Sequence, residues 1–343
     1  RLPLLALALA AALPLTAEPV AAQSPGERIV DLSGAWRFRV GDDLARAGDA
    51  FDDAGWDTVP VPSSWEDGGY WGYDGYAWYR RTFTLPEAPH RGLVLRLGRI
   101  DDVDQVWVNG HFVGSTGRFP AMKYESAYYA ERAYAVPPEY LRAGRNVVAV
   151  RVFDGELEGG LLEGPVGLYR DADAPPLALD LSGRWRFRPG DSPDHLRGAT
   201  HGWAAVTVPA KWEPQGFPDL DGYAWYRKPF TLPSRLLRSD LVLLVGKIDD
   251  LHEVYVNGQR IGGTEGDIEN RWIRGDEWQK LRAYRLPLRL LRDKNEIAVR
   301  VYDGLYEGGI YEGPVGILTE ADYERWRHGG GLLGRLRSVL GLD

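Results

Sequence analysis

Most of this chain consists of two similar copies of one sequence. The block of residues 31–39 recurs at 180–188, and the block of residues 74–80 recurs at 221–227, so the spacing between copies stays at 147 to 149 residues. A period this long is far above that of solenoid repeats, in which each unit is one small supersecondary element. Each copy is therefore expected to be a whole domain, and the two domains are expected to share one fold.

Within each copy, apolar and polar side chains alternate with a period of two, which is typical of strands with one buried face. Trp36 and Phe38 share such a face. Asn109-Gly110 stands between two alternating runs, and Asn-Gly favours a two-residue hairpin because both positions take positive φ. With 42 Gly and 23 Pro in the chain, short strands and tight turns are expected. The sequence predicts an all-β fold of two tandem jelly-roll β-sandwich domains.

The two ends of the chain and the linker between the copies allow the chain to be divided into expected segments. Arg1 begins a basic and then apolar run that ends on the small residues Val20, Ala21 and Ala22, as in a secretory signal peptide. The apolar run is shorter than the ~20 residues that span a bilayer, so we expect a secreted or periplasmic protein without a transmembrane span. The expected segments are a signal peptide at 1–22, a first module at 23–170, a linker at 171–176, a second module at 177–320 and a helical tail at 321–343.

Charge and cysteine content narrow the function classes. The formal net charge is -8, and nucleic acid phosphates require clustered Lys and Arg instead, so no nucleic acid partner is expected. The chain has no cysteine, so each module must be stable through its core alone. In the tail, Leu332, Leu336 and Leu340 recur at helical spacing, which predicts a short C-terminal helix.

Several blocks of the repeat resemble a known family. Residues 78–86 read Trp-Tyr-Arg-Arg-Thr-Phe-Thr-Leu-Pro, residues 106–110 read Val-Trp-Val-Asn-Gly, and residues 144–154 complete the set. This order of blocks resembles the sugar-binding jelly-roll domain of glycoside hydrolase family 2. The second copy, with Tyr-Val-Asn-Gly at 255–258, is also similar to the jelly roll inserted in sialate O-acetylesterases. Both belong to the galactose-binding-like superfamily, so the resemblance implies that fold for each copy.

The resemblance implies a place beside glycan-processing hydrolases, and the chain departs from their catalytic domains. A family 2 glycosidase carries two catalytic glutamates on a (β/α)-barrel, for which these 343 residues leave no room. Gly-Asp-Ser at 190–192, with Asp249 and His252, mimics the nucleophile and base blocks of an esterase. Pro193 and the lack of a following amphipathic helix remove the strand-to-helix turn that such a nucleophile needs. No catalytic residue is therefore expected.

Acidic side chains among glycines are one class of candidate ligand-binding residues. They lie in the loops that follow Asp154 and Asp303 and in two Ile-Asp-Asp blocks. Carboxylates accept hydrogen bonds from sugar hydroxyls, and clustered carboxylates also suit a structural Ca²⁺. A purely structural role, such as capping N–H groups or pairing with Arg80 and Arg227, stays open. The acidic candidates are Asp101, Asp102, Asp154, Glu158, Glu163, Asp249, Asp250, Asp303, Glu307 and Glu312.

Aromatic side chains in loops are the other class, because sugar rings stack on flat apolar surfaces. The loop before Trp78 is dense in them, and the second copy carries its own in a different loop. The aromatic candidates are Tyr70, Trp71, Tyr73, Tyr76, Trp272 and Trp278. Tryptophans at repeated strand positions are instead expected in the core; they are Trp36, Trp65, Trp78, Trp185, Trp212 and Trp225.

Together these features favour an exported, non-catalytic carbohydrate-binding or accessory protein of glycan processing. Its expected partner is carbohydrate, and a separate glycan hydrolase is a second one. No organic cofactor is expected. Two alternatives stay open: a glycan hydrolase, or a fragment of one separated from its catalytic domain, and a protein-interaction module without a sugar ligand.

Overall fold

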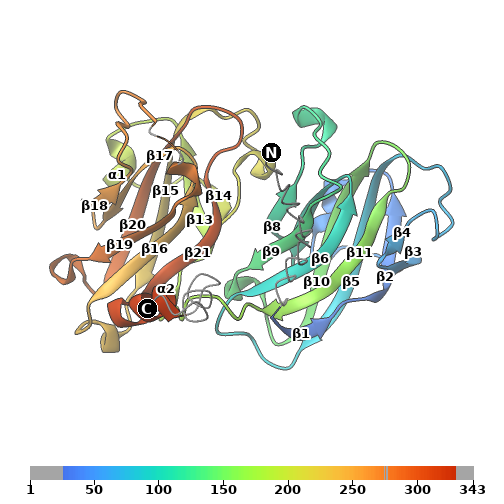
Figure 1. Ribbon diagram of the computed structural model, residues 1–343, viewed down its shortest axis with the longest axis horizontal. Helices are drawn as coiled ribbons and strands as arrows, with labels where there is room; N and C mark the ends of the chain where they lie inside the picture. The colour runs from blue at the N-terminus through green and yellow to red at the C-terminus, as the bar shows by residue number, and fades with distance from the viewer. Residues whose placement is uncertain (1–25, 274, 276, 330–343) are drawn as a thin grey trace, which may run out of the picture.

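The computed structural model describes residues 26–273, 275 and 277–329, and the expected signal peptide lies outside them. Two antiparallel β sandwiches lie side by side along the long axis of the molecule (Figure 1). The predicted all-β fold is confirmed. No helix in the described ranges is long and apolar enough to cross a membrane.

The first sandwich packs a sheet of order β1-β11-β6-β9, with β4 added to β11, against a sheet of order β3-β2-β5-β10-β7-β8. Its strands are β1 (Glu27–Asp31), β2 (Gly34–Val40), β3 (Asp57–Val61), β4 (Ser63–Ser64), β5 (Gly75–Leu85), β6 (Leu93–Asp101), β7 (Val103–Val108), β8 (His111–Thr116), β9 (Glu131–Val136), β10 (Gly144–Asp154) and β11 (Gly160–Arg170). Short 3₁₀ helices η1 (Leu44–Ala47), η2 (Pro120–Met122) and η3 (Pro138–Tyr140) lie in its loops.

The second sandwich repeats this path with sheets of order β12-β21-β16-β19 and β14-β13-β15-β20-β17-β18. Its strands are β12 (Leu179–Asp180), β13 (Gly183–Pro189), β14 (Ala204–Val208), β15 (Gly222–Thr231), β16 (Leu241–Ile248), β17 (Leu251–Val256), β18 (Gln259–Gly263), β19 (Leu281–Leu286), β20 (Lys294–Asp303) and β21 (Ile310–Thr319). Its helices are α1 (Asp194–Arg197), α2 (Glu320–Gly329), η4 (Glu213–Gln215), η5 (Ser234–Leu236), η6 (Glu277–Gln279) and η7 (Leu288–Leu290).

Each sandwich buries one apolar face of each sheet, as the alternation predicts. Trp36 and Phe38 are fully buried in the first core, where Tyr79 packs edge-on against both. All six tryptophans expected inside are buried. Trp78 and Trp225 face away from the main cores and form small clusters of their own on the outer side of the sheet. The fold is therefore stabilised mainly by burial of large aromatic and aliphatic side chains.

The Asn-Gly hairpin has the predicted geometry. Val108 pairs with His111 across the turn, and φ is +51° at Asn109 and +79° at Gly110. The second sandwich repeats the turn at Asn257 and Gly258. Positive φ at both central positions matches the right-handed twist of the flanking strands. The same turn therefore closes the same hairpin in both sandwiches.

A short C-terminal helix is present as α2, which begins before the leucine repeat of the tail. Tyr323 and Trp326 pack against Val242, Leu244 and Leu318 on the outer face of the β16–β21 pair. Thr319 caps the start of the helix: its hydroxyl accepts a hydrogen bond from the Asp322 N–H at 3.1 Å, as a typical N-cap residue does. The leucines from position 332 onward lie outside the described residues.

The two sandwiches touch along the edges that carry β8 and β14. The Thr207 hydroxyl donates a hydrogen bond to the Phe112 carbonyl at 2.7 Å and lies 2.9 Å from the Tyr140 hydroxyl. Arg118 reaches across from the first sandwich to Glu307 of the second at 3.4 Å. These contacts place loops of the first sandwich next to the Glu307 loop.

Candidate functional site

Three acidic side chains meet at one end of the first sandwich. The carboxylate oxygens of Asp101, Asp102 and Asp154 lie within 4.8 Å of one another. Asp101 ends β6 and Asp154 ends β10, and the Asp102 N–H donates to the Phe153 carbonyl at 3.1 Å. Strand pairing therefore brings together residues that are about fifty positions apart in the chain. We call this set the first triad.

The second sandwich carries the same arrangement. Asp249, Asp250 and Asp303 also lie within 4.8 Å of one another, and we call them the second triad. The Asp249 N–H donates to the Gly309 carbonyl at 3.0 Å, and the Gly304 N–H donates to Asp250 at 2.8 Å. Both triads consist of predicted candidates, and hard oxygen ligands in such clusters could hold a metal ion.

The triads differ in how their oxygens are satisfied. In the first triad, Asp102 accepts hydrogen bonds from the hydroxyls of Tyr124 and Ser126 and from the Gly155 N–H. Tyr124 stands beside Gly155, and the corresponding glycine of the second sandwich, Gly304, has Ile273 beside it. A methyl group cannot donate a hydrogen bond. The second triad therefore lacks the hydroxyl that Tyr124 supplies to the first.

Burial raises the pKa of every triad carboxyl group except Asp102, whose pKa is held below its usual range by hydrogen bonds from Ser126, Tyr124 and the Gly155 N–H. Burial, with the neighbouring charges of Asp249 and Asp250, raises the pKa of Asp303 to about 8. Burial and the charge of Asp250 raise the pKa of Asp249 to about 6. In the first triad, burial raises the pKa of Asp154 to about 7. The charged form of these three carboxylates is costly because each has left water and faces like charges.

A cavity of about 640 Å³ opens beside the second triad. Asp249 and Asp250 lie on its wall with the predicted candidates Trp278 and Glu307. The cavity also takes in Lys211, Ile273, Tyr306 and Tyr311, which sequence reasoning missed. Flat aromatic side chains beside a few polar groups are the usual lining of a small-molecule site.

The aromatic wall of this cavity is held in place by a buried ion pair. Arg282 of β19 lies 2.8 Å from Glu277, and both side chains are almost fully buried. Glu277 precedes Trp278, and the Tyr311 hydroxyl donates to the Trp278 carbonyl at 2.8 Å. Trp278 itself stays 45% exposed. Its backbone is thus fixed while its ring remains available to a ligand.

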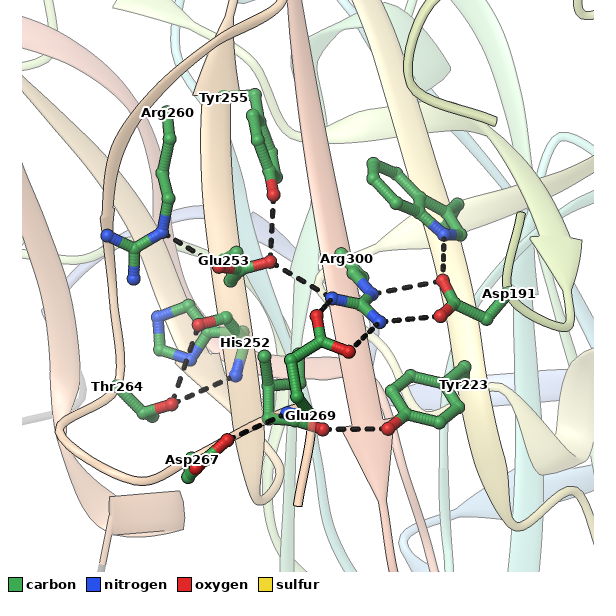
Figure 2. Close-up of polar contacts among 12 residues, drawn as sticks. Asp191, Tyr223, His252, Glu253, Tyr255, Arg260, Thr264, Asp267, Glu269 and Arg300 are labelled. Carbon is green, nitrogen blue, oxygen red and sulfur yellow. Dashed lines mark hydrogen bonds and ion pairs between the residues drawn. The ribbon is translucent and has the colours of Figure 1, made fainter. Parts of the chain in front are cut away.

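A second buried cation anchors the loop that carries Trp272. Figure 2 shows the Arg300 guanidinium between three carboxylates, with Asp191 and Glu269 both at 2.5 Å and Glu253 at 3.2 Å. The Tyr223 hydroxyl donates to the Ile268 carbonyl at 2.7 Å. Trp272 follows on this loop and is exposed, but it does not line the cavity beside the second triad.

The histidine and the first aspartate of the esterase-like residues are engaged in other contacts. His252 is buried in β17, and its Nε2 lies 2.6 Å from the Tyr284 hydroxyl. Burial and the charge of Arg282 hold the pKa of His252 well below its usual range. Asp191 is engaged with Arg300 (Figure 2). The histidine is therefore a neutral part of the sheet, in agreement with the sequence argument.

The aromatic candidates of the first sandwich are mostly turned inward. Tyr70 and Tyr73 pack against the first core, and their hydroxyls donate to Asp57 at 2.5 Å and to the Tyr76 carbonyl at 2.8 Å. Tyr76 stacks on Phe119 and is half-buried. Trp71 is 78% exposed. The four residues therefore do not present one common aromatic surface to solvent.

The glutamate candidates are dispersed. Glu163 pairs with Arg99, Glu312 pairs with Lys247 at 2.8 Å, and Glu158 is exposed. Glu307 binds Lys211 and Arg118. Pairing with Arg80 or Arg227, one form of the structural alternative, is not seen, because Arg80 binds Asp53 and Arg227 binds Glu296. Capping of N–H groups, its other form, is seen where the Gly155 N–H donates to Asp102 and the Gly304 N–H to Asp250.

Of the missed cavity residues, two had a signal in the sequence. Tyr306 and Tyr311 stand in the repeated glycine loop, where only the carboxylates were selected. Lys211 precedes Trp212, one of the repeated core tryptophans. The sequence alone gave no sign that the segment ending in Trp212 meets the glycine loop, although the Trp212 N–H donates to the Gly308 carbonyl at 3.2 Å.

Comparison with known proteins agrees with this architecture. The family described as the β-galactosidase second all-β domain matches residues 49–157. A β-galactosidase of Arthrobacter sp. (strain B7) is 30% identical over 167 residues, which are 36% of this chain and 15% of that protein. This chain has a glycoside hydrolase family 2-like all-β domain arrangement. The predicted resemblance to the family 2 domain is thereby confirmed.

Other similar proteins are much longer than this chain. A putative β-glucuronidase of Formosa agariphila is 26% identical over 138 residues, which are 36% of this chain and 12% of that protein. Among solved structures, a calcium-binding mutant of Bacteroides uniformis β-glucuronidase 2 is 16% identical, with a TM-score of 0.36, and the match covers 85% of this chain and 28% of that one. The matched part is thus a minor fraction of each of these glycosidases.

Proposed function

We propose that the protein is a non-catalytic carbohydrate-binding or accessory protein of glycan processing, and that glycan binds in the cavity beside the second triad. The observation that carries the proposal is the composition of this cavity. Asp249 and Asp250 offer acceptors for sugar hydroxyls. Trp278, Tyr306 and Tyr311 offer ring faces on which sugar C–H groups stack.

The family 2-like arrangement supports the accessory part of the proposal. The relatives are glycosidases, and the chain matches a small, all-β part of them. A piece that recognises glycan beside a separate catalytic domain fits that relationship. We also propose that the protein is exported, as the first 22 residues suggest.

A divalent cation such as Ca²⁺ belongs to this proposal. Each triad places three carboxylates within 4.8 Å, and such a cluster offers the hard oxygen ligands that a divalent cation takes. The ion would add a structural element to the glycan-binding end of the sandwich.

The proposal is tested by glycan-array binding of the full chain beside two tryptophan variants. Trp278→Ala removes one stacking surface of the cavity and is expected to reduce binding of any recognised glycan by about fivefold or more, since stacking contacts are worth roughly 1–3 kcal/mol. Trp71→Ala, at an exposed site on the other sandwich, is the matched control and should bind as the wild type does.

Two outcomes would count against this site. Binding that is lost in Trp71→Ala and kept in Trp278→Ala would move the glycan to the first sandwich. A wild-type chain that binds no glycan, with calcium or with chelator, would contradict the carbohydrate-binding function itself and favour a protein-interaction role.

A further inference from the structure

The two triads have the same residue types but different surroundings, and the difference points to one ion site. None of Asp249, Asp250 and Asp303 forms an ion pair with a Lys or Arg side chain in the described part of the chain. Lys211 is the nearby cation, and its ammonium group is engaged by Glu307. The three carboxylates therefore have no direct ion-pair partner, and the Lys211 charge acts on Asp249 only from a longer distance.

The buried oxygens of Asp303 give a second, independent sign. Asp303 is fully buried, and neither of its carboxylate oxygens has a hydrogen-bond partner. A buried acceptor without a partner costs roughly 1–3 kcal/mol, and more when it is charged. Native proteins avoid this cost, so an unpartnered buried carboxylate aimed into an acidic cluster indicates a missing ligand.

The first triad is satisfied more fully, because only one Asp154 oxygen is buried without a partner, whereas Asp303 leaves both of its oxygens without one. Both oxygens of Asp102 accept hydrogen bonds, from Tyr124 and Gly155 on one side and from Ser126 on the other. Asp101 in turn hydrogen-bonds to Asp102. These hydroxyl groups use acceptor lone pairs of Asp102 that would otherwise be free to ligate an ion.

We infer that the second triad, and not the first, is a divalent cation site suited to Ca²⁺, with Asp249, Asp250 and Asp303 as its protein ligands. Ca²⁺ takes six to eight oxygen ligands, more than three carboxylates supply in most geometries. Asp249 and Asp250 line the cavity, so the remaining positions face it. They are open to water or to a pair of hydroxyls of a bound ligand.

The inference narrows the cation part of the proposed function to one triad and does not depend on its glycan part; only coordination of the ion by a bound sugar rests on both. Cation binding can be measured with no sugar present. Failure of one proposal is therefore distinguishable from failure of the other.

The test is calorimetric titration of the metal-free full chain with Ca²⁺, together with Tb³⁺ luminescence excited through tryptophan. We expect one ion per chain, with a dissociation constant of about 10⁻³ M or tighter, as in extracellular calcium modules. Tb³⁺ should be sensitised by Trp278, which lines the same cavity. Trp278→Phe should lower the luminescence while calorimetric Ca²⁺ binding is kept.

Paired variants decide which triad binds. Asp303→Asn should weaken Ca²⁺ binding by at least about tenfold, and Asp154→Asn, the matched change in the first triad, should leave it unchanged. Asp249→Asn serves if Asp303→Asn does not fold, as judged by its thermal transition. Two ions per chain, or a loss in Asp154→Asn alone, would overturn the assignment to the second triad.

Absence of any Ca²⁺ binding up to about 10 mM would overturn the ion site altogether. In that case the unpartnered hydroxyl of Tyr226 and indole N–H of Trp212 would point to ordered water as the occupant, since buried water usually joins such unpaired groups.

Discussion

Arg282 and Glu277 form a buried ion pair at 2.8 Å that joins β19 to the turn carrying Trp278. In the first sandwich the corresponding buried arginine has a different counter-charge, because Arg132 of β9 binds Asp104 of β7 at 2.8 Å. The second sandwich has His252 at the position of Asp104. The arginine therefore turns to Glu277, and in doing so it fixes the aromatic wall of the cavity.

This ion pair should matter for both stability and ligand binding. Glu277→Gln leaves the Arg282 guanidinium buried without its counter-charge, which is expected to cost about 3–5 kcal/mol. The loop that carries Trp278 should loosen, so glycan affinity should fall as well. Chemical denaturation and glycan binding measure the two effects.

Glu312→Gln is the matched control for this change. Glu312 pairs with Lys247 at 2.8 Å on the surface, and exposed pairs contribute about 0–1 kcal/mol. A Glu277→Gln protein that unfolds at the same denaturant concentration as Glu312→Gln would contradict the role given to the buried pair.

Added calcium should stabilise the protein through the second triad. Since only the folded chain assembles the three carboxylates, an ion at 100 times its dissociation constant adds about 2.7 kcal/mol to the free energy of unfolding. Differential scanning calorimetry with Ca²⁺ and with chelator should show a higher Tm with the ion. An equal shift in Asp303→Asn would place the stabilising ion elsewhere.

The first triad should acquire an ion when its hydroxyl donors are removed. Tyr124 and Ser126 donate to Asp102, so the double change Tyr124→Phe with Ser126→Ala removes both hydroxyl donors and leaves only the Gly155 N–H on this carboxylate. We expect this variant to bind a second Ca²⁺ by calorimetry. Unchanged stoichiometry in a folded variant would mean that hydroxyl donors are not what separates the two triads.

The first triad should also make stability depend on pH. Burial raises the pKa of Asp154 to about 7, whereas an unfolded aspartate titrates near pH 4, at about 3.9. Between these values the folded state binds more protons than the unfolded state, so stability falls as pH rises. Asp154→Asn should match the wild type at the low end of this window and exceed it in Tm at about pH 8.

Thermal melts of both proteins in chelator at the two pH values measure this effect. Other buried carboxyl groups titrate in both proteins, so the difference between them isolates Asp154. A Tm difference that does not grow with pH would show that Asp154 is not charged at a cost in the folded state.

The fold was open to prediction because its signals are local. Alternation placed Trp36 and Phe38 on one buried face, and the Asn109-Gly110 turn specified its own hairpin. Tyr70 and Tyr73 show the limit, because a loop has no periodicity that would separate an exposed ring from one packed on the core.

The candidate site was only partly open to prediction, because it depends on strand pairing. Asp249, Asp250 and Asp303 were each selected for their own loop, and the register of β16, β20 and β21 brings them together. Lys211 and Ile273 join them from two further loops. Because these residues are far apart in the chain, no local sequence pattern predicts that they meet.

Hydrogen–deuterium exchange of the full chain, with and without a saturating glycan found on the array, tests the central claim most directly. Glycan in the cavity beside the second triad should slow exchange at residues 277–281 and 304–311, with no change at residues 66–76. Protection at 66–76 without protection at 304–311 would contradict the claim and place the glycan on the first sandwich.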